Sequence, residues 1–426
     1  TWNNRMGVNV LLIGNGAREH ALAWKLNQSS KVSGILIAPG NAGTALVGRN
    51  ISVRADDIDG LVDAVKDNKV DIVVVGPEAP LADGVVNRFQ SIDVPIFGPT
   101  KSAARLESSK AFARDLMNRC HVPTPYYQVV HSYADGEKYV LDHPGPIVVK
   151  ADGLSRGKGA IVCMDSEAAL RALKLCMVEK AFGTAGEIVV LEEYLDGREI
   201  SVFSFVDGTN FSQPVAACDY KRIGDGDIGD NTGGMGSYSP PNIWNAQLMR
   251  LISEQVMRPV IDGMRVQGDP FVGVLYAGLM LTNNGPKVLE FNCRLGDPEA
   301  QVILPLMETD LMDVVTSCVE GNIDKQSITW GTESCVGVVA ASGGYPDAYT
   351  EGCSIEVGDI EEDVLVFHGG TDINEAGDLV TAGGRVLTVV AKSKVLPDAR
   401  GIVYRNLKQI TFNDIYYRND IGIITK

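Results

Sequence analysis

Glu290, Asn292 and Arg294 alternate along one short segment, KVLEFNCRLGDPE. Side chains of a β-strand point to opposite faces in turn, so these three would share one face. A carboxylate and an amide oxygen are hard ligands that suit Mg²⁺ beside phosphate groups, and a guanidinium binds phosphate oxygens through paired donors. The spacing therefore indicates a site for metal-assisted phosphoryl transfer. The alternative is that Glu290 is an ordinary surface acid.

A second phosphate-binding feature is the glycine-rich segment GLSRGKGA, which follows the apolar run PIVVK ending at Lys150. Gly153, Gly157 and Gly159 would let the loop, which also carries Lys158, fold over a polyphosphate and exclude water on closing. The segment does not have the P-loop pattern G-x-x-x-x-G-K-[ST]. It indicates a phosphate-covering flap between two strands.

The segment VLEEYLDGRE adds features of a nucleoside site. Backbone after Glu192 can pair with an adenine edge. Glu199 follows seven residues later, across a glycine turn, where its carboxylate can accept hydrogen bonds from ribose hydroxyls.

Near the N-terminus, VLLIGNGAREH begins like a dinucleotide-binding turn, but Glu19 stands where the third glycine of that motif belongs. The second strand ends in ILIAPGN and offers no acid for a nicotinamide ribose, so a nicotinamide oxidoreductase is disfavoured. Gly14 and Gly16 still direct amides outward at a helix N-terminus, which favours an anion. The guanidinium of Arg18 can add further hydrogen-bond donors to that anion.

Two further loops would lie at the same sheet edge, PGNAGT and GPEAPL. Ligands of open parallel sheets bind at that carboxyl edge. Glu78 there can accept from sugar hydroxyls or an amine, so the edge suits a sugar phosphate. The alternative is three tight turns that need glycine and proline only for their geometry.

The elements that would position these residues begin with a strand–helix alternation over the first hundred residues. Strands are expected at 8–14, 32–40, 70–76 and 94–100, and helices at 17–27, 61–69 and 81–90. This alternation predicts a doubly wound parallel sheet. A helix capped by serine is expected from residue 108, then a small antiparallel unit with a flap that includes the strands on either side of the 194–197 turn. A long helix and two strands follow, and a β-rich region begins near Thr332.

Composition narrows the class of protein. The net charge of −16 argues against nucleic acid or an anionic membrane surface as a partner. The eight cysteines have no C-x-x-C spacing, so we expect reduced structural thiols in a cytoplasmic protein. No apolar run reaches membrane-span length. His368 is expected to be a buried structural histidine.

Six segments together resemble the phosphoribosylamine–glycine ligase family, ATP-grasp enzymes of purine biosynthesis: IGNGAREHALAWK, APGNAGT, GPEAPL, KADGLSRGKG, NTGGMGSYSP and EFNCRLGDPE. The resemblance covers nearly the whole chain. It implies an α/β fold with a sugar-phosphate domain (1–107), an ATP-grasp central subdomain (108–127 and 194–331), an ATP-grasp flap subdomain (128–193) and a C-terminal β-rich α+β domain (332–426). It implies an enzyme that joins glycine to 5-phosphoribosylamine with ATP through glycyl phosphate. Some members of the family are fused to further purine enzymes, and we expect this chain to be monofunctional and a monomer or weak dimer.

The resemblance also implies roles for individual residues. The ATP-binding residues would be Lys110, Lys150, Gly157, Lys158, Gly159, Glu192, Glu193, Leu195 and Glu199. Those for phosphoribosylamine and glycine would be Gly14, Asn15, Gly16, Arg18, Gly40, Asn41, Gly76, Glu78, Asn231 and Gly234. Glu290 and Asn292 would hold Mg²⁺ or Mn²⁺, and the catalytic residues would be Arg294, Lys150 and Asp297.

Two features depart from the family pattern. Ser155-Arg156 occupy the flap where small residues are commoner, and the strand before Glu290, VGVLYAGLML, supplies no acidic metal ligand. Two alternatives stay open: another ATP-grasp carboxylate–amine ligase or biotin-carboxylase-like enzyme, and a non-catalytic nucleotide-binding regulator.

Overall fold

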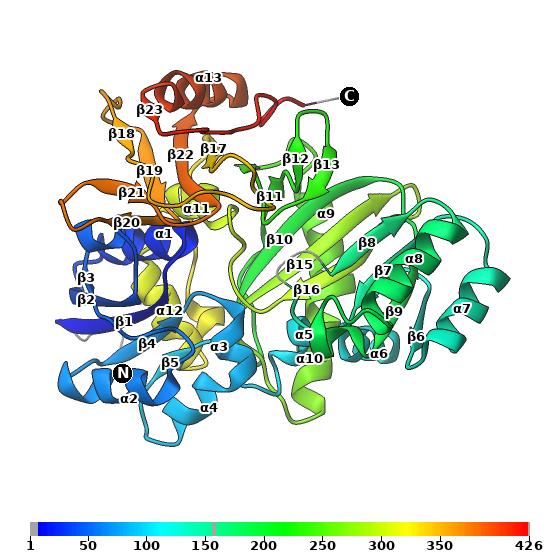
Figure 1. Ribbon diagram of the computed structural model, residues 1–426. Coiled ribbons are helices and arrows are strands. Elements are labelled where there is room, and N and C mark those ends of the chain that lie inside the picture. The colour runs from blue at the N-terminus through cyan, green and yellow to red at the C-terminus, as the bar shows by residue number, and fades with distance from the viewer. Residues whose placement is uncertain (1–6, 156–158, 425–426) are drawn as a thin grey trace.

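The computed structural model describes residues 7–155 and 159–424 (Figure 1). Gly157 and Lys158 of the expected flap lie outside the described residues. Among the described residues no helix is both long and apolar enough to cross a membrane. All eight cysteines are free thiols, as expected from their spacing.

The N-terminal unit is a five-stranded parallel sheet in the order β3-β2-β1-β4-β5, which confirms the predicted doubly wound fold. Its strands are β1 (Val8–Gly14), β2 (Val32–Pro39), β3 (Arg49–Asn50), β4 (Ile72–Val75) and β5 (Ile96–Phe97). Its helices are α1 (Ala17–Leu26), α2 (Ile58–Asp67), α3 (Glu78–Asp83) and α4 (Val85–Gln90). The single helix expected over 81–90 is wrong, because Gly84 takes φ +95° and separates α3 from α4.

The centre of the molecule is an eight-stranded sheet, ordered β16-β15-β10-β11-β14-β17-β22-β19. Its strands in chain order are β10 (Arg198–Asp207), β11 (Val215–Asp219), β14 (Gly236–Ser239), β15 (Val272–Thr282), β16 (Gly285–Asn292), β17 (Ser334–Ala341), β19 (Leu365–His368) and β22 (Arg385–Ser393). The β-rich region after residue 332 is therefore hydrogen-bonded to the central unit through β14 and β17.

A separate four-stranded antiparallel sheet, β6-β9-β7-β8, forms the right-hand end of Figure 1. It contains β6 (Tyr127–Val130), β7 (Ile147–Ala151), β8 (Ala160–Cys163) and β9 (Val189–Glu193), packed against α7 (Tyr133–Asp142) and α8 (Ser166–Met177). We expected the strands on both sides of the 194–197 turn to belong to this small unit. That was wrong for the second one, because β10 pairs with β11 and β15 of the large sheet.

The remaining helices support these sheets. They are α5 (Arg105–Ser108), α6 (Lys110–Arg119), α9 (Ala246–Ile252), α10 (Arg258–Val266), α11 (Ala300–Ile303), α12 (Leu311–Val319) and α13 (Leu396–Leu407). Ser109 caps α6 by accepting from the Phe112 amide, as its sequence position predicts. Three small ribbons complete the fold: β12 (Arg222–Gly224) with β13 (Ile228–Asn231), β18 (Glu356–Val357) with β23 (Ile410–Thr411), and β20 (Thr371–Ile373) with β21 (Leu379–Thr381).

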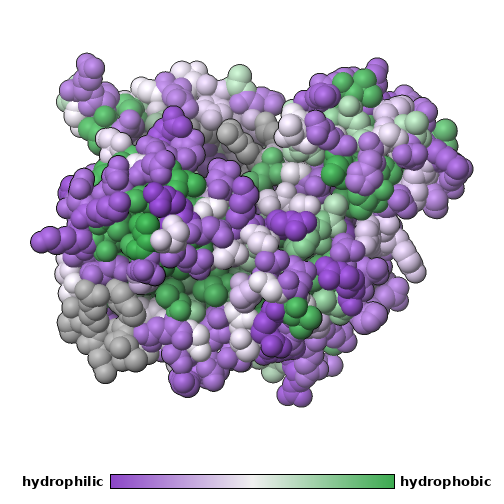
Figure 2. Space-filling model, turned by 90° about the horizontal axis from the view of Figure 1, so that it is seen from below, coloured by the Kyte–Doolittle hydropathy of each residue, from purple (hydrophilic) through white to green (hydrophobic). Residues whose placement is uncertain are grey.

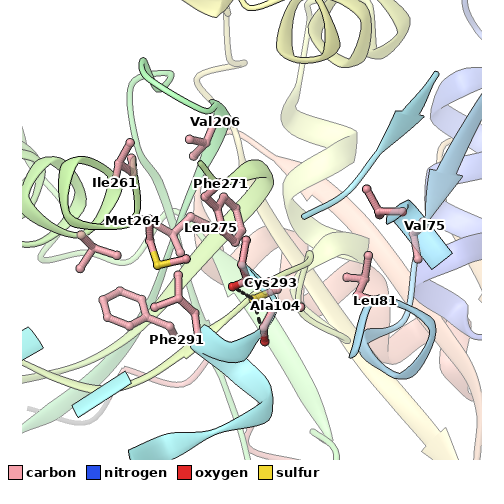
Figure 3. Packing of buried hydrophobic residues seen from close by; sticks show 14 of the residues in the cluster. Val75, Leu81, Ala104, Val206, Ile261, Met264, Phe271, Leu275, Phe291 and Cys293 are labelled. Carbon is pink, nitrogen blue, oxygen red and sulfur yellow. Dashed lines mark hydrogen bonds between the residues drawn. The ribbon is translucent and has the colours of Figure 1, made fainter. Parts of the chain in front are cut away.

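One apolar core joins the N-terminal unit to the central sheet. In Figure 3, Val75 and Leu81 of the N-terminal unit lie on one side of Cys293, and Phe271 and Phe291 of the central unit lie on the other. All belong to the same buried cluster. Burial of such a shared core holds the two units as one frame. The surface seen from below is mostly hydrophilic, with hydrophobic residues in separate patches (Figure 2).

Candidate active site

A cleft of about 1240 Å³ lies among three parts of the molecule. These are the four-stranded sheet β6-β9-β7-β8, called the flap sheet from here on, the face of β15 and β16, and the N-terminal unit. Most residues expected from sequence line it: Arg18, Glu78, Lys110, Lys150, Gly159, Glu192, Glu193, Leu195, Glu199, Asn231, Glu290, Asn292, Arg294 and Asp297. Asn15, Gly16, Gly40 and Asn41 instead line a second cavity of about 330 Å³, which Asp297 also borders. Gly14, Gly76 and Gly234 line neither.

The strand β16 presents Glu290 and Asn292 to the cleft. Burial raises the pKa of Glu290, but the charges of Lys221, Lys150 and Lys110 outweigh it and hold the pKa below its ordinary value. Glu290 is therefore an ionised carboxylate among ammonium groups. The described residues contain no group of three or more His, Cys, Asp or Glu side chains arranged to hold a metal ion.

Lys150 at the end of β7 is held in a buried network of charged groups. Its Nζ lies 2.8 Å from Glu192 Oε2 and donates to the Leu289 carbonyl at 2.9 Å. Arg114 of α6 lies 2.6 Å from the other oxygen of Glu192 and also donates to the Leu289 carbonyl. The carboxylate of Glu192 thus orients Lys150. This leaves the backbone that follows Glu192 to pair with the adenine of a nucleotide. Sequence reasoning missed Arg114.

Lys110 is the first residue of α6, and its Nζ donates to the Gly153 carbonyl at 3.1 Å. Burial lowers its pKa. The backbone amide of Lys110 also bonds to the Asp152 carbonyl. This lysine therefore joins the start of the flap loop to the central unit.

A further cluster faces the cleft from β10, β11 and β15. Glu199 pairs with Lys221 at 2.9 Å, so the proposed ribose acid already has a cationic partner. Burial raises the pKa of Asp219 to about 8, against the charge of Lys221. The buried Glu299 accepts from Tyr276 Oη at 3.0 Å, and Ser201 joins the same network. Lys221, Asp219 and Glu299 were not predicted as site residues.

Arg294 connects the two halves of the cleft. Its Nε lies 3.2 Å from Glu78 of α3, and its Nη2 lies 2.8 Å from Glu107 at the end of α5. Burial opposes ionisation of Glu78, but Arg294 and Arg18 lower its pKa to about 2. Burial raises the pKa of Glu107 to about 7, with Arg294 acting in the opposite direction. The guanidinium of Arg294 thus pairs with two carboxyl groups, those of Glu78 and Glu107, whose pKa values differ widely.

Glu19 occupies the place where the third glycine of the first loop was missing. Its Oε2 accepts from the Gly16 amide at 2.6 Å, and its Oε1 lies 2.6 Å from Arg18 Nε. A Cβ added at Gly14 or Gly76 would meet the Glu19 side chain at 2.4 or 2.2 Å. Gly14 and Gly76 are therefore spacers for this carboxylate, and the Gly16 amide is already used inside the protein.

Asn41 ties the N-terminal loops to the C-terminal region. Its Nδ2 donates to the carbonyls of His368 at 2.7 Å and Asn15 at 2.9 Å, while its Oδ1 accepts from the amides of Gly43 and Thr44. The side chain has no donor or acceptor left over to be the main ligand contact. It shapes the second cavity instead.

His368 is buried, as the sequence predicted, and its amide donates to His20 Nδ1 at 2.8 Å. Burial lowers the pKa of His20 to about 3 and that of His368 to about 4. Both rings are therefore neutral at physiological pH. They pack edge-on across the contact between α1 and β19.

The Asn231 to Gly236 loop reaches the site through its first three residues rather than through Gly234. The Gly234 amide bonds to Thr232 Oγ1, whereas Asn231, Thr232 and Gly233 line the cleft. Arg385 of β22 donates to the carbonyls of Gly233 and Asp297 and pairs with the Asp297 carboxylate at 3.3 Å. Arg385 borders both cavities and was missed from the sequence.

Comparisons with known proteins agree with this arrangement. Family models described as the N, ATP-grasp (A) and C domains of phosphoribosylglycinamide synthetase match residues 8–107, 108–300 and 335–423. A phosphoribosylamine–glycine ligase of Vibrio parahaemolyticus is 46% identical over 97% of both chains. One of Chlorobaculum tepidum is 46% identical over 97% of this chain and 99% of its own.

Solved structures give the same relation. A phosphoribosylamine–glycine ligase of Thermotoga maritima superposes with a TM-score of 0.84 at 32% identity, covering 97% of this chain and all of its own. A biotin carboxylase domain of Hydrogenobacter thermophilus superposes with a TM-score of 0.75 at 13% identity, over 97% of this chain and 92% of its own. At that identity the second likeness shows a shared fold alone.

Proposed function

Because the chain belongs to the phosphoribosylglycinamide synthetase family, whose members join glycine to 5-phosphoribosylamine with ATP in purine biosynthesis, we propose how its cleft performs that ligation. Glycine is first phosphorylated by ATP to glycyl phosphate. The amine of phosphoribosylamine then displaces phosphate and forms glycinamide ribonucleotide. The observation that carries this proposal is Arg294, which pairs with Glu78 of the N-terminal unit and donates to Asn292 at the end of β16, the strand of the phosphoryl site.

The nucleotide is assigned to the space between the flap sheet and β15–β16. Backbone of Glu193 to Leu195 would pair with adenine, and Glu199 with the ribose hydroxyls. Lys110 and Lys150 would neutralise the phosphates, and Gly159 belongs to the covering loop. Phosphoryl transfer depends mainly on positioning and charge neutralisation, which these groups supply.

A divalent cation, Mg²⁺ or Mn²⁺, is assigned to Glu290 and Asn292. The donor set fits a hard cation, because it consists of one ionised carboxylate oxygen and one amide oxygen facing the phosphate site. With only two protein oxygens, phosphates and water would complete the coordination. When bound, such an ion neutralises charge on phosphoryl oxygens.

Phosphoribosylamine is assigned to the junction of both cavities. Arg385 and Asp297 border the two spaces, so the phosphate can lie in the smaller cavity beside Asn15, Gly16 and Gly40 while the amine reaches Glu78 and Arg294. Glu19 and Asn41 act indirectly by fixing these loops. We retain the four-part division of the chain at residues 107, 127, 193 and 331.

The direct test of the proposed function is ADP release by the purified protein with ATP and phosphoribosylamine, with glycine present or omitted. We expect ADP release only when glycine is present, with one glycinamide ribonucleotide per ADP. ADP release that is independent of glycine, or without amide product, would contradict the proposal.

We further propose a cytoplasmic enzyme that acts on small molecules alone, without nucleic acid or membrane, as a monomer or weak dimer. The net charge of −16 and the mostly polar surface of Figure 2 support this view. Sedimentation velocity at micromolar concentration tests the oligomeric state, and a stable higher oligomer would contradict it.

A further inference from the structure

Two carboxylates share the guanidinium of Arg294, and they come from different helices. Glu78 begins α3 at the carboxyl edge of the N-terminal sheet, and Glu107 lies in α5, which packs against both α3 and β16. Both line the large cleft. Glu107 also accepts the Cys293 amide at 2.8 Å through its second oxygen.

The two carboxylates have opposite surroundings. The Glu78 side chain is 30% exposed and faces two guanidinium groups, those of Arg18 and Arg294. The Glu107 side chain is only 7% exposed. The groups that face it are Arg294 and the Cys293 thiol after β16, Glu78 of α3, Arg18 of α1 and Lys110 of α6. Glu78 is thus fixed as an anion, whereas Glu107 can gain and lose a proton near neutral pH, a division typical of acid–base sites.

Glu107 lies where the two half-reactions must meet. It interacts electrostatically with Arg18 and Glu78 on the side assigned to phosphoribosylamine, and with Lys110 on the side assigned to ATP. Building on the function proposed above, we propose that the Glu107 carboxylate accepts the proton that the amine of phosphoribosylamine loses when it attacks glycyl phosphate.

The step balances without another reactant. The amine nitrogen forms a bond to the glycyl carbonyl carbon, and the carbon–oxygen bond to phosphate breaks. The phosphate leaves with that electron pair. The proton from nitrogen moves to a Glu107 oxygen and later passes to solvent. Arg294 remains charged throughout and keeps the carboxylate directed toward the amine.

Most other carboxylates in the cleft have a partner, as Glu107 does, but that partner is not Arg294, the guanidinium that joins the two halves of the cleft. Those with a cationic or hydrogen-bonding partner are Glu192, Glu193, Glu199, Asp227, Asp297 and Glu299. Asp196 directly follows the Glu193 to Leu195 backbone that is assigned to adenine. Asp219 is the competitor, but the charged group that acts on it most strongly is Lys221, which pairs with Glu199, the residue assigned to the ribose. It therefore lies with the first half-reaction.

The test separates the two chemical steps in one experiment. Excess enzyme is mixed with limiting labelled ATP, saturating glycine and phosphoribosylamine, and quenched at short times. ADP reports the first step and glycinamide ribonucleotide reports the second. In Glu107→Gln enzyme we expect ADP to form within a few-fold of the normal rate, and the amide to form on the order of 10² more slowly, the usual effect of losing a general base. The matched variant Asp219→Asn should not show this split.

A second variant guards against a merely structural effect. Glu107→Ala leaves space for a small carboxylate, so formate should restore the amide-forming step in this variant and have no effect on Glu107→Gln. Equal loss of both steps in Glu107→Gln, loss of neither, or a split in Asp219→Asn instead would overturn the assignment. Failure of the unmodified enzyme to form ADP in a glycine-dependent manner would overturn the proposed function instead, so the two failures are distinguishable.

Discussion

The carboxylate of Glu19 lies 2.6 Å from the amide nitrogen of Gly16, at the start of the first helix. A carboxylate in this position accepts a hydrogen bond from an amide that would otherwise face a bound anion. Its negative charge is also stabilised by the positive end of the helix dipole. The loop therefore does not use its full complement of amides for a ligand. Its shape depends on an internal carboxylate that also orients Arg18.

Substitution of Glu19 tests the role of this contact. Glu19→Gln replaces one acceptor oxygen by an amide donor, which must face either the Gly16 amide or Arg18. We expect the KM for phosphoribosylamine to rise about tenfold, in line with about 1–2 kcal/mol for an unsatisfied buried group. The KM for ATP should stay near normal. Steady-state kinetics with each substrate varied measures both, and a rise confined to ATP would contradict the assignment of the loop.

Glu78 allows a more direct test of the sugar side. Glu78→Gln keeps the size of the side chain but removes the charge that faces Arg18 and Arg294. We expect a 10- to 100-fold higher KM for phosphoribosylamine, roughly the value of a charge-assisted hydrogen bond. Arg18→Ala is a less clean variant, because Arg18 also donates to the Leu295 carbonyl. Unchanged phosphoribosylamine kinetics would place that substrate elsewhere.

Glu290 provides the only carboxylate proposed for the metal. Glu290→Gln removes that charge, so we expect kcat to fall by on the order of 10² or more at limiting Mg²⁺. The unfolding temperature should also fall, because Lys221, Lys150 and Lys110 lose a neighbouring carboxylate, so kcat is compared well below the unfolding transition. Asn292→Asp is the matched variant and should be less harmful, because it adds a charge where a cation is held. Near-normal turnover of Glu290→Gln at limiting Mg²⁺ would show that the metal binds elsewhere.

The glycyl phosphate route makes an isotopic prediction. If a carboxylate oxygen of glycine attacks the γ-phosphorus of ATP, that oxygen leaves with phosphate. Glycine labelled with ¹⁸O in its carboxylate should therefore yield phosphate containing one ¹⁸O atom, measured by mass spectrometry. The same reaction with unlabelled glycine, ATP and water gives the background level of ¹⁸O in phosphate. Phosphate without label would exclude the route.

The neutral His20 predicts an acid-dependent loss of stability. Its pKa is about 3 in the folded chain and 6.5 in the unfolded chain, so the unfolded chain binds an extra proton between these values. Stability is complete above pH 6.5 and falls by about 1.4 kcal/mol per pH unit as the pH drops toward 3. His20→Asn keeps an acceptor for the His368 amide, and its free energy of unfolding in urea should fall less between pH 6 and 4. Parallel slopes would contradict the prediction.

Sequence alone predicted the parts of the site that depend on local spacing. The parallel sheet, the serine cap of α6, and the shared face of Glu290 and Asn292 all follow from short-range periodicity. Arg114, Glu107 and Arg385 were missed because their roles come from contacts across long sequence separations. Arg294 and Glu107, for example, are 187 residues apart. A charged residue in an ordinary helical pattern gives no signal that it will be buried against such a partner.

The roles of the glycines were also hidden. Gly14 and Gly76 resemble ligand-facing turns in the sequence, but they make room for the Glu19 side chain. Likewise, the 194–197 turn looks like a hairpin connection because both flanking strands are close in sequence. Which of the two sheets each strand joins depends on the elements that it packs against. The local sequence pattern does not show those contacts.

The hydrogen bonds between β14 and β17 determine how the polypeptide can be divided. Separating the two parts of the chain at residue 331, the border that the β-rich pattern suggests, would leave β14 and β17 each with an unpaired edge and mostly buried side chains exposed, and such edges favour aggregation. The flap unit of residues 127–193 has its own sheet and its own apolar core. A protein engineer who wishes to excise, swap or circularly permute a module should therefore cut within the middle of the chain, around α6 and β10, and leave the two ends together.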